Sequence, residues 1–145
     1  MVTYVRYVLD ANVVSALRRP EREPAVARWA EPIPVGDLYI TAPTVAELGL
    51  GVAAMERRDP AAGALLRRWF ESAVLAVFSD RVLPFDRQAA LILASYRVPE
   101  HAPYDDALIA AVVQANGMTL ATRNTRHFAP LGIALVDPWE CPATP

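Results

Sequence analysis

The sequence has 14 basic side chains, all of them arginine, and no lysine. A P-loop nucleotide site requires a lysine in its phosphate-binding loop. Receiver domains and haloacid-dehalogenase-type phosphatases normally place a lysine beside an acidic pocket. The missing lysine therefore argues against all three of these classes of phosphate chemistry.

Cysteine and net positive charge are also scarce. Cys141 is the only cysteine, so no internal disulfide can form, which favours a reducing compartment such as the cytoplasm. No apolar run reaches the length of a membrane span, and the N-terminal stretch lacks the basic lead and the cleavage site of a signal peptide. The formal net charge of -2 excludes nucleic-acid binding by overall positive charge. We therefore expect a cytoplasmic protein with no membrane segment, whose contacts with nucleic acid are local.

The chain has the size and the pattern of a single α/β domain. Its 145 residues, 54% of them hydrophobic, are enough for one well-filled core. Short apolar runs predict strands at residues 4–9, 37–41, 81–86, 118–124 and 132–137. Helical patterns lie between them, at residues 13–17, 25–30, 44–57, 61–78, 86–96 and 104–117. Strands joined through helices predict a mostly parallel central sheet flanked by helices, in one domain over residues 1–145 with a proline-rich tail at 138–145.

The first strand ends on an acid, Asp10. Parallel α/β sheets carry their functional groups at this end of the strands. A helix cap is the simpler explanation, because Asp10 or Asn12 could accept hydrogen bonds from the free amides of the next helix. The choice between the two depends on which other polar groups gather at the same edge of the sheet.

Glu47 follows the second strand, in the segment "TAPTVAELGLGV". Thr44 and Glu47 have the spacing of a capping box, which is the structural explanation. Glu47 also shares a helix face with the small residues Gly51 and Ala54, which would let another element approach closely. A solvated capping glutamate needs no such face.

Two more polar groups stand at the start of the last long helix and at the end of the fourth strand. Asp105 and Asp106 are adjacent, and successive helical residues point about 100° apart, so only one of them can face a given site. Asp106 is the better inward candidate because it precedes the apolar Ile109 by one turn, which leaves Asp105 free to cap the helix. Thr122 and Asn124 close the strand in "LATRNTRHF", where Asn124 is also a common turn former.

One hypothesis explains these groups together. Carboxylates brought to one cleft repel each other and raise one another's pKa unless a cation lies between them. With no cysteine and no histidine close to them, their donors are all oxygens, which favours Mg²⁺ or Mn²⁺ over zinc. Such ions retain water and bind phosphate oxygens, so a phosphodiester is the expected substrate.

The residues also resemble a known family. The series "YVLDANVVSAL", "TAPTVAELGLGV" and "YDDALIAAVVQANGMTLATRNTRHF" is similar to the PIN-domain ribonucleases, in particular the VapC toxins of bacterial VapBC toxin-antitoxin pairs. "VLPFD" and "VDPWE" resemble the FitB-like branch, and the likeness spans nearly the whole chain in order. It implies a PIN fold and a Mg²⁺- or Mn²⁺-dependent endoribonuclease that hydrolyses RNA with a metal-activated water. Transfer RNA and ribosomal RNA are both within the family's range.

The resemblance also implies partners. The family forms homodimers that bind a cognate VapB-type antitoxin, giving a toxin-antitoxin hetero-oligomer in which the C-terminal segment of the antitoxin lies across the pocket. The predicted helix at 61–78 has more apolar surface than one core face requires, which independently favours a protein partner.

Carried over residue by residue, the resemblance makes Asp10, Glu47 and Asp106 the metal ligands. The fourth catalytic position falls on Asn124, where the family usually has an aspartate. An amide carries no charge, so a second ion would be held more weakly. Six further residues are candidates for supporting roles: Asn12, Asp105 and Thr122 near the metal, and Arg123, Arg126 and His127 as contacts to RNA phosphates. The last three would equally suit a solvated loop.

Two other functions stay open on the residues alone. A non-catalytic PIN-like module that binds RNA or protein would tolerate Asn124, and also Ala11, where the family often has a hydroxyl. A phosphomonoesterase that uses the aspartate of "LDANV" is disfavoured by the missing lysine and by Asn12, which stands where a second aspartate would be expected.

Overall fold

A computed structural model describes residues 5–141 of the chain. Its five strands are β1 (Tyr7–Leu9), β2 (Leu38–Thr41), β3 (Val82–Leu83), β4 (Thr119–Ala121) and β5 (Ala134–Val136). Its α-helices are α1 (Ala11–Leu17), α2 (Pro24–Ala30), α3 (Ala42–Arg58), α4 (Pro60–Trp69), α5 (Arg87–Ser95), α6 (Tyr104–Asn116) and α7 (Thr125–Phe128). The predicted α/β fold with a central sheet flanked by helices is confirmed.

The strands form one five-stranded sheet in the order β3-β2-β1-β4-β5. Every neighbouring pair is parallel, and Val8 in the central β1 is in register with Tyr39 of β2 and Leu120 of β4. The carboxyl ends of β1, β2 and β4 therefore lie at one edge of the sheet, where α1, α3 and α7 begin.

Both faces of the sheet are covered, as successive residues of β1 make clear. Leu9 packs on one side with Val13 of α1 and Val52 of α3. Val8 packs on the other side with Ile109 of α6 and Phe128 of α7. All of these side chains are buried, because side chains of a strand alternate between the faces and each face has its own layer of helices.

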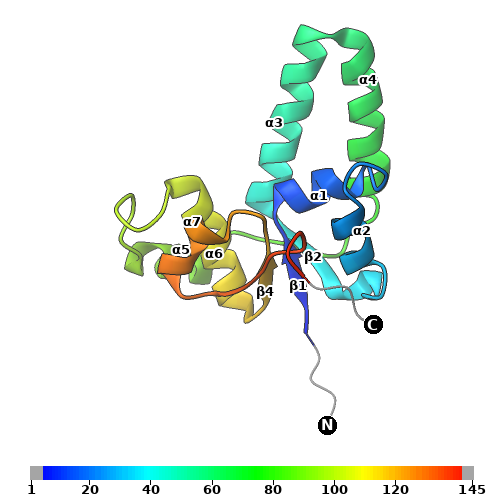
Figure 1. Ribbon diagram of the computed structural model, residues 1–145. Helices are drawn as coiled ribbons and strands as arrows, with labels where there is room; N and C mark the ends of the chain where they lie inside the picture. The colour runs from blue at the N-terminus through cyan, green and yellow to red at the C-terminus, as the bar shows by residue number, and fades with distance from the viewer. Residues whose placement is uncertain (1–4, 142–145) are drawn as a thin grey trace.

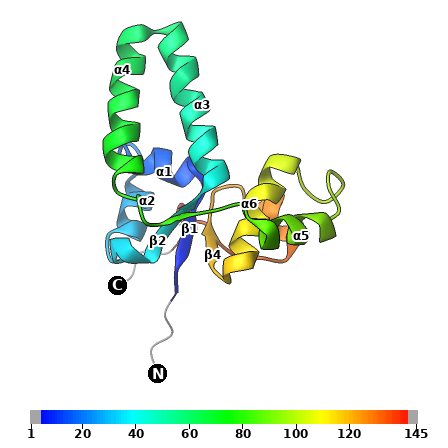
Figure 2. The ribbon, with the colours of Figure 1, turned by 180° about the vertical axis from the view of Figure 1, so that it is seen from behind.

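Helices α3 and α4 project from the sheet as an antiparallel pair, which we call the arm (Figure 1; Figure 2). The Arg67 guanidinium donates two hydrogen bonds to the Glu56 carboxylate, at 3.1 and 2.7 Å. At Gly63 the two helices come so close that an added Cβ would strike the backbone of Glu56. The close approach predicted at Gly51 and Ala54 is wrong at Gly51, where an added Cβ would meet nothing within 4 Å. The small residue that the packing requires is on α4.

Several predicted boundaries change. The first strand begins at Tyr7 rather than at Tyr4, which lies outside the described residues. The helix predicted at 61–78 is α4 followed by a π-helical turn, Phe70–Leu75. The start of the predicted tail is part of the fold, because the Trp139 indole N–H donates to the Glu23 carboxylate at 2.8 Å.

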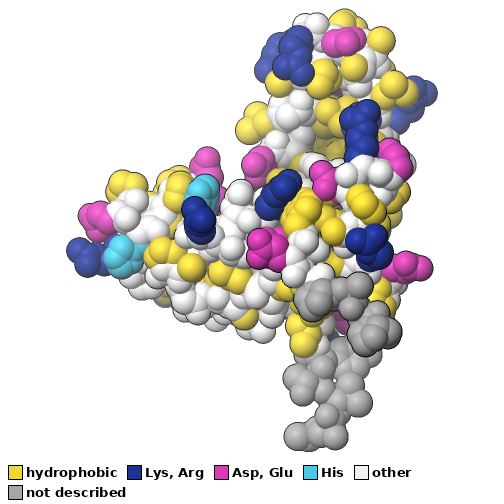
Figure 3. Space-filling model, in the orientation of Figure 1, with side chains coloured by type: hydrophobic (Ala, Val, Ile, Leu, Met, Phe, Trp, Pro, Cys, Tyr) yellow, Lys and Arg dark blue, Asp and Glu magenta, His cyan; other side chains and the backbone are white. Residues whose placement is uncertain are grey.

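Apolar side chains are exposed on and near the arm (Figure 3). They include Leu50 and Leu65 on the two helices and Val77 beyond the π-helical turn, which are 72%, 56% and 41% exposed. Among the described residues, no helix is both long enough and apolar enough to cross a membrane.

Candidate active site

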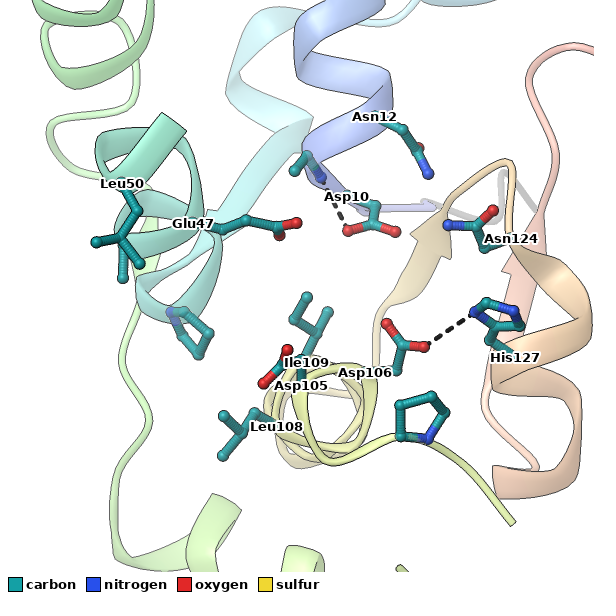
Figure 4. A pocket seen from close by; sticks show the side chains of 14 residues that line it. Asp10, Asn12, Glu47, Leu50, Asp105, Asp106, Leu108, Ile109, Asn124 and His127 are labelled. Atoms are coloured by element: carbon teal, nitrogen blue, oxygen red, sulfur yellow. Dashed lines mark hydrogen bonds and ion pairs between the residues drawn. The ribbon is translucent and has the colours of Figure 1, made fainter. Parts of the chain in front are cut away.

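A cavity of about 560 Å³ opens at the edge of the sheet where β1 and β2 end (Figure 4). Helices α1, α3, α6 and α7 bring their N-terminal parts to its walls. Most of the side chains predicted for the site line it, namely Asp10, Asn12, Glu47, Asp105, Asp106, Asn124 and His127. Thr122, Arg123 and Arg126 lie outside its lining.

Asp10 is both the helix cap and a cavity residue. Its Oδ1 accepts from the Ala11 N–H at 2.8 Å, which makes it the N-cap of α1, and its Oδ2 accepts from the Thr122 hydroxyl at 2.7 Å. Burial raises the pKa of Asp10; the hydrogen bonds from Thr122 and Ala11 counteract this, while the nearby Asp106 charge raises the pKa further. The predicted helix cap is therefore confirmed, and the same carboxylate lines the cavity, where its functional role stays a prediction.

Thr122 is fully buried and fixes the direction of the Asp10 carboxylate. The Thr122 hydroxyl donates its hydrogen to the Asp10 carboxylate, and its oxygen accepts from the Asn124 N–H at 3.0 Å. Asn12 of α1 also contacts the chain just after β4, since its Oδ1 accepts from the Arg123 N–H at 3.4 Å. The hydroxyl of Thr122 therefore acts on Asp10 and does not face the cavity.

Glu47 lies in the second turn of α3 and points its carboxylate toward Asp10 (Figure 4). The predicted capping box is wrong, because α3 begins at Ala42 and its cap is Thr41, whose hydroxyl oxygen accepts from the Thr44 N–H at 3.1 Å. Burial raises the pKa of Glu47, and the charges of Asp10, Asp106 and Asp105 raise it further. Glu47 thus faces three like charges.

Asp106 faces the cavity, as predicted, and Asp105 is the more exposed of the pair. The expectation that only one of them can face the site is wrong, because Asp105 lines the same cavity. The predicted cap by one of them is wrong, because the N-cap of α6 is Pro103 and no side chain caps the helix. The Asp106 Oδ2 lies 3.1 Å from Nδ1 of His127, which comes from α7. The expectation that no histidine lies near the acids is therefore wrong.

A second hollow, of about 380 Å³, adjoins the cavity and shares Asn124 and His127 with it. Arg123 and Arg126 line this hollow together with the acids Asp137 and Glu140. The Arg123 guanidinium lies over the ring of Trp139, 4.9 Å from its centroid, which holds this cation in place. The two arginines bring positive charge next to the acidic cavity, and the two carboxylates of the hollow offset part of it.

The opposite wall of the cavity is apolar, which the sequence reasoning missed. Pro43 and Leu50 from α3 and Leu108 from α6 line it. The sequence does contain one signal for this wall. Leu50 follows Glu47 by one turn, so the two side chains lie on the same side of α3, and Leu50 is largely exposed there.

The donor set is suited to a hard divalent ion. Asp10, Glu47 and Asp106 present carboxylate oxygens to one cavity, and the pKa of Asp10 and of Glu47 is raised by burial and by neighbouring negative charge, which a cation would relieve. Among residues 5–141, no three acidic, histidine or cysteine side chains are grouped closely enough to hold an ion as they stand. The chemistry of the donors, three carboxylates, still fits a divalent metal ion.

Comparison with known proteins shows the family of the chain. A profile of the PIN domain matches residues 7–132. The Ribonuclease VapC14 of Mycobacterium tuberculosis is 54% identical over 72 residues, which are 50% of this chain and 70% of that protein. The Toxin FitB of Neisseria gonorrhoeae is 34% identical over 141 residues, which are 92% of this chain and 98% of that protein.

A solved structure of FitAB bound to an IR36 DNA fragment has the same fold. It superposes with a TM-score of 0.84 at 34% identity, over 94% of this chain and 97% of that chain. The matched profile and these relatives show that the chain belongs to the PIN-domain family, in the group that includes the VapC ribonucleases and the FitB toxin.

Proposed function

We propose that the protein is the toxin of a type II toxin-antitoxin pair, and that it cleaves RNA phosphodiester bonds with Mg²⁺ or Mn²⁺. The observation that carries the proposal is the meeting of Asp10, Glu47 and Asp106, from three separate elements, in one cavity where two of them have a raised pKa. Acids in this arrangement destabilise one another unless a cation joins them. The names of the relatives support ribonuclease activity.

In this proposal Asp10, Glu47 and Asp106 hold the ion. A bound divalent ion neutralises the charge that develops on the phosphate and lowers the pKa of a water molecule. Asp10 is fixed in direction by Thr122 and by the amide of Ala11, so it serves as the rigid ligand.

Glu47 is the residue that we assign to proton transfer. Its carboxylate lines the cavity and points toward Asp10, so it is placed to accept a proton from a water molecule in the cavity (Figure 4). Asp106 is less available because His127 already contacts its Oδ2. Asn124 lines the cavity beside Asp106 and carries no charge, so its amide is suited to align the attacking water.

The RNA backbone would run from the cavity into the adjoining hollow. Arg123, Arg126 and His127 line that hollow and would bind the phosphates next to the cleaved bond. These are local contacts on a chain of net charge -2, so recognition would depend on the shape and the exposed bases of the RNA, as in transfer or ribosomal RNA. Such RNAs are found in the cytoplasm.

The proposed protein partner is a cognate VapB-type antitoxin. The solved relative is a FitAB assembly, and this chain exposes Leu65 and Val77 on and just beyond the arm. Exposed apolar side chains at this part of the molecule favour burial against another protein. We expect a homodimer of the toxin within a hetero-oligomer with the antitoxin.

The test is expression without an antitoxin, with the wild type compared to Asp106→Ala. We expect growth arrest and new RNA ends with the wild type alone. Asp59→Asn is the matched control, because Asp59 caps α4 far from the cavity and asparagine caps equally well. Equal growth of wild type and Asp106→Ala would contradict the toxin proposal.

The second candidate, a non-catalytic module, is favoured by one observation, the uncharged Asn124 in the cavity. It predicts that the purified protein binds RNA without cutting it and that Asp10→Asn leaves that binding intact. Divalent-dependent cleavage that disappears in Asp10→Asn would exclude it.

A further inference from the structure

The Arg123 guanidinium rests on the indole ring of Trp139, beside the proposed cleavage site. It lies 4.9 Å from the centroid of the ring. Arg123 lines the hollow that adjoins the acidic cavity, and the two spaces share Asn124 and His127. A phosphate bound at Arg123 would therefore lie next to the cavity in which the carboxylates meet.

The contact with the ring uses the flat face of the guanidinium. Among residues 5–141, no ion pair involves Arg123. An arginine that stacks on a ring can still donate from its edge, where the N–H groups match a phosphate in a two-hydrogen-bond arrangement. Arg126 lines the same hollow, and in the part of the chain that the structure describes it has no such ring contact. The two arginines therefore differ in how firmly they are held.

Trp139 is itself fixed by several contacts. Its indole N–H donates to the Glu23 carboxylate at 2.8 Å, just before α2, and its backbone N–H donates to Oδ1 of Asp137 at 2.9 Å. Its side chain also packs against the buried core that contains Leu9 and Val13. The ring is thus a rigid support, and the Asp137 carboxylate, which lines the hollow, takes part in holding it.

The backbone of Arg123 is also held. It follows Thr122, which is fully buried, and its N–H donates to Oδ1 of Asn12 at 3.4 Å. With the backbone fixed at one end and the guanidinium on the ring at the other, the side chain is ordered before any RNA arrives. A side chain that is ordered in advance loses less conformational entropy when it binds its ligand.

We propose that Trp139 is a positioning residue for RNA binding, whose ring holds the Arg123 guanidinium in place for a phosphate next to the cleaved bond. This inference rests on the proposed function, because it requires the RNA to run from the cavity into the hollow. It goes further by assigning a role to the segment after β5 and, through the contact with Glu23, to the start of α2.

The test is equilibrium binding of fluorescently labelled bulk transfer RNA to the full chain, in EDTA so that no divalent ion supports cleavage. Trp139→Leu removes the ring and should weaken binding about threefold to tenfold, because the RNA must then order the Arg123 side chain itself. Trp139→Phe keeps an aromatic face and should restore part of the lost affinity.

A double-mutant cycle separates positioning from a general effect on the fold. In an Arg123→Ala background, Trp139→Leu should cause no further loss of affinity, because the side chain that the ring supports is gone. Arg126→Ala is the matched control, since Arg126 lines the same hollow. In that background Trp139→Leu should cause its full loss.

Other outcomes overturn the inference. An equal loss from Trp139→Leu with and without the Arg123 side chain would mean that Trp139 acts through the fold. Binding by Trp139→Leu that equals the wild type would also overturn the proposal. If Trp139→Leu does not fold, Arg123→Lys decides, because Arg123 is exposed and lysine keeps the charge without the flat face. We expect a similar loss in Arg123→Lys, and wild-type affinity there would overturn the proposal.

Arg123→Ala separates this inference from the proposed function. If Arg123→Ala weakens RNA binding and Trp139→Leu does not, the proposed phosphate contact stands and the role of Trp139 falls. If neither Arg123→Ala nor Arg126→Ala weakens RNA binding, the path of the RNA in the proposed function fails, and the inference fails with it.

Discussion

Glu47 and Glu56 lie on the same helix, α3, in regions of opposite electrostatic character. Glu56, in the arm, receives two hydrogen bonds from Arg67, and these lower its pKa. Glu47, in the cavity, faces Asp10, Asp106 and Asp105, and burial together with these charges raises its pKa. The arm thus supplies the counter-charge of Glu56, whereas the charges that shift the pKa of Glu47 are all negative.

Under the proposed function, the contrast separates charges that serve the fold from charges that would serve a ligand. The Arg67–Glu56 pair joins two helices and is complete without any other molecule. The cavity acids destabilise their surroundings when no cation is bound, and a protein retains such strain at functional sites. The following predictions test this division.

The largest difference is expected between two charge removals on α3, one in the cavity and one in the arm. Glu47→Gln should reduce divalent-dependent RNA cleavage at least about 100-fold, because it removes a proposed ligand and proton acceptor. Glu56→Gln should leave the cleavage rate unchanged, since Glu56 contacts only the arm. The measurement is cleavage of a labelled RNA by purified protein. Equal rates for Glu47→Gln and the wild type would refute the assignment.

A smaller effect is expected from glycine substitutions along the arm. Gly63→Ala should lower the free energy of unfolding by about 1–3 kcal/mol, because the new methyl group overlaps the backbone of Glu56 and forces the helices apart. Gly51→Ala, where a Cβ meets nothing within 4 Å, should leave stability unchanged or raise it by up to about 1 kcal/mol. Chemical denaturation measures both. A Gly63→Ala protein as stable as the wild type would mean that the helices are not closely packed there.

The smallest effect concerns the stability of the metal-free protein. The folded state holds the Asp10 proton more tightly than the unfolded chain, in which the pKa has its ordinary value of 3.8. Stability should therefore fall as pH rises from that value through the higher folded-state pKa, and the loss should persist at neutral pH.

Asp10→Asn removes this penalty and still caps α1, because asparagine accepts from the Ala11 N–H. At pH 7 without metal, the variant should melt a few degrees above the wild type, since 1 kcal/mol corresponds to about 2–4 °C in domains of this size. Added Mn²⁺ should raise the Tm of the wild type but not of the variant. A metal-free variant that melts below the wild type would argue against uncompensated charge at Asp10.

The meeting of Asp10, Glu47 and Asp106 was predictable from sequence because it depends on topology. Parallel strands place their carboxyl ends at one edge, and the periodicity of α6 turns Asp106 inward. These relations depend on the order of the elements and on helical geometry, and both can be derived from the pattern of residues.

The contacts that depend on loop geometry were not predictable in the same way. The contact between His127 and Asp106 requires the exact course of the chain between β4 and α7, which no periodicity describes. The cap of α3 was placed on Thr44 instead of Thr41, because both threonines have suitable spacing to polar partners and only the backbone decides where the helix begins. The close approach at Gly63 depends on how two helices cross, which a single helix cannot reveal.

The strand order β3-β2-β1-β4-β5 determines what remains of the molecule when the cavity acids are neutralised. The cavity at the carboxyl ends of the strands arises because the chain winds away from β1 in both directions, so it is a product of winding and not of the acids that line it. A chain whose cavity acids are neutralised would keep the cavity and the arm. It would therefore keep the surfaces that we propose to bind RNA and the antitoxin. Under the proposed function, such a chain would still bind the antitoxin and RNA, but it would not cleave the RNA and would not arrest growth.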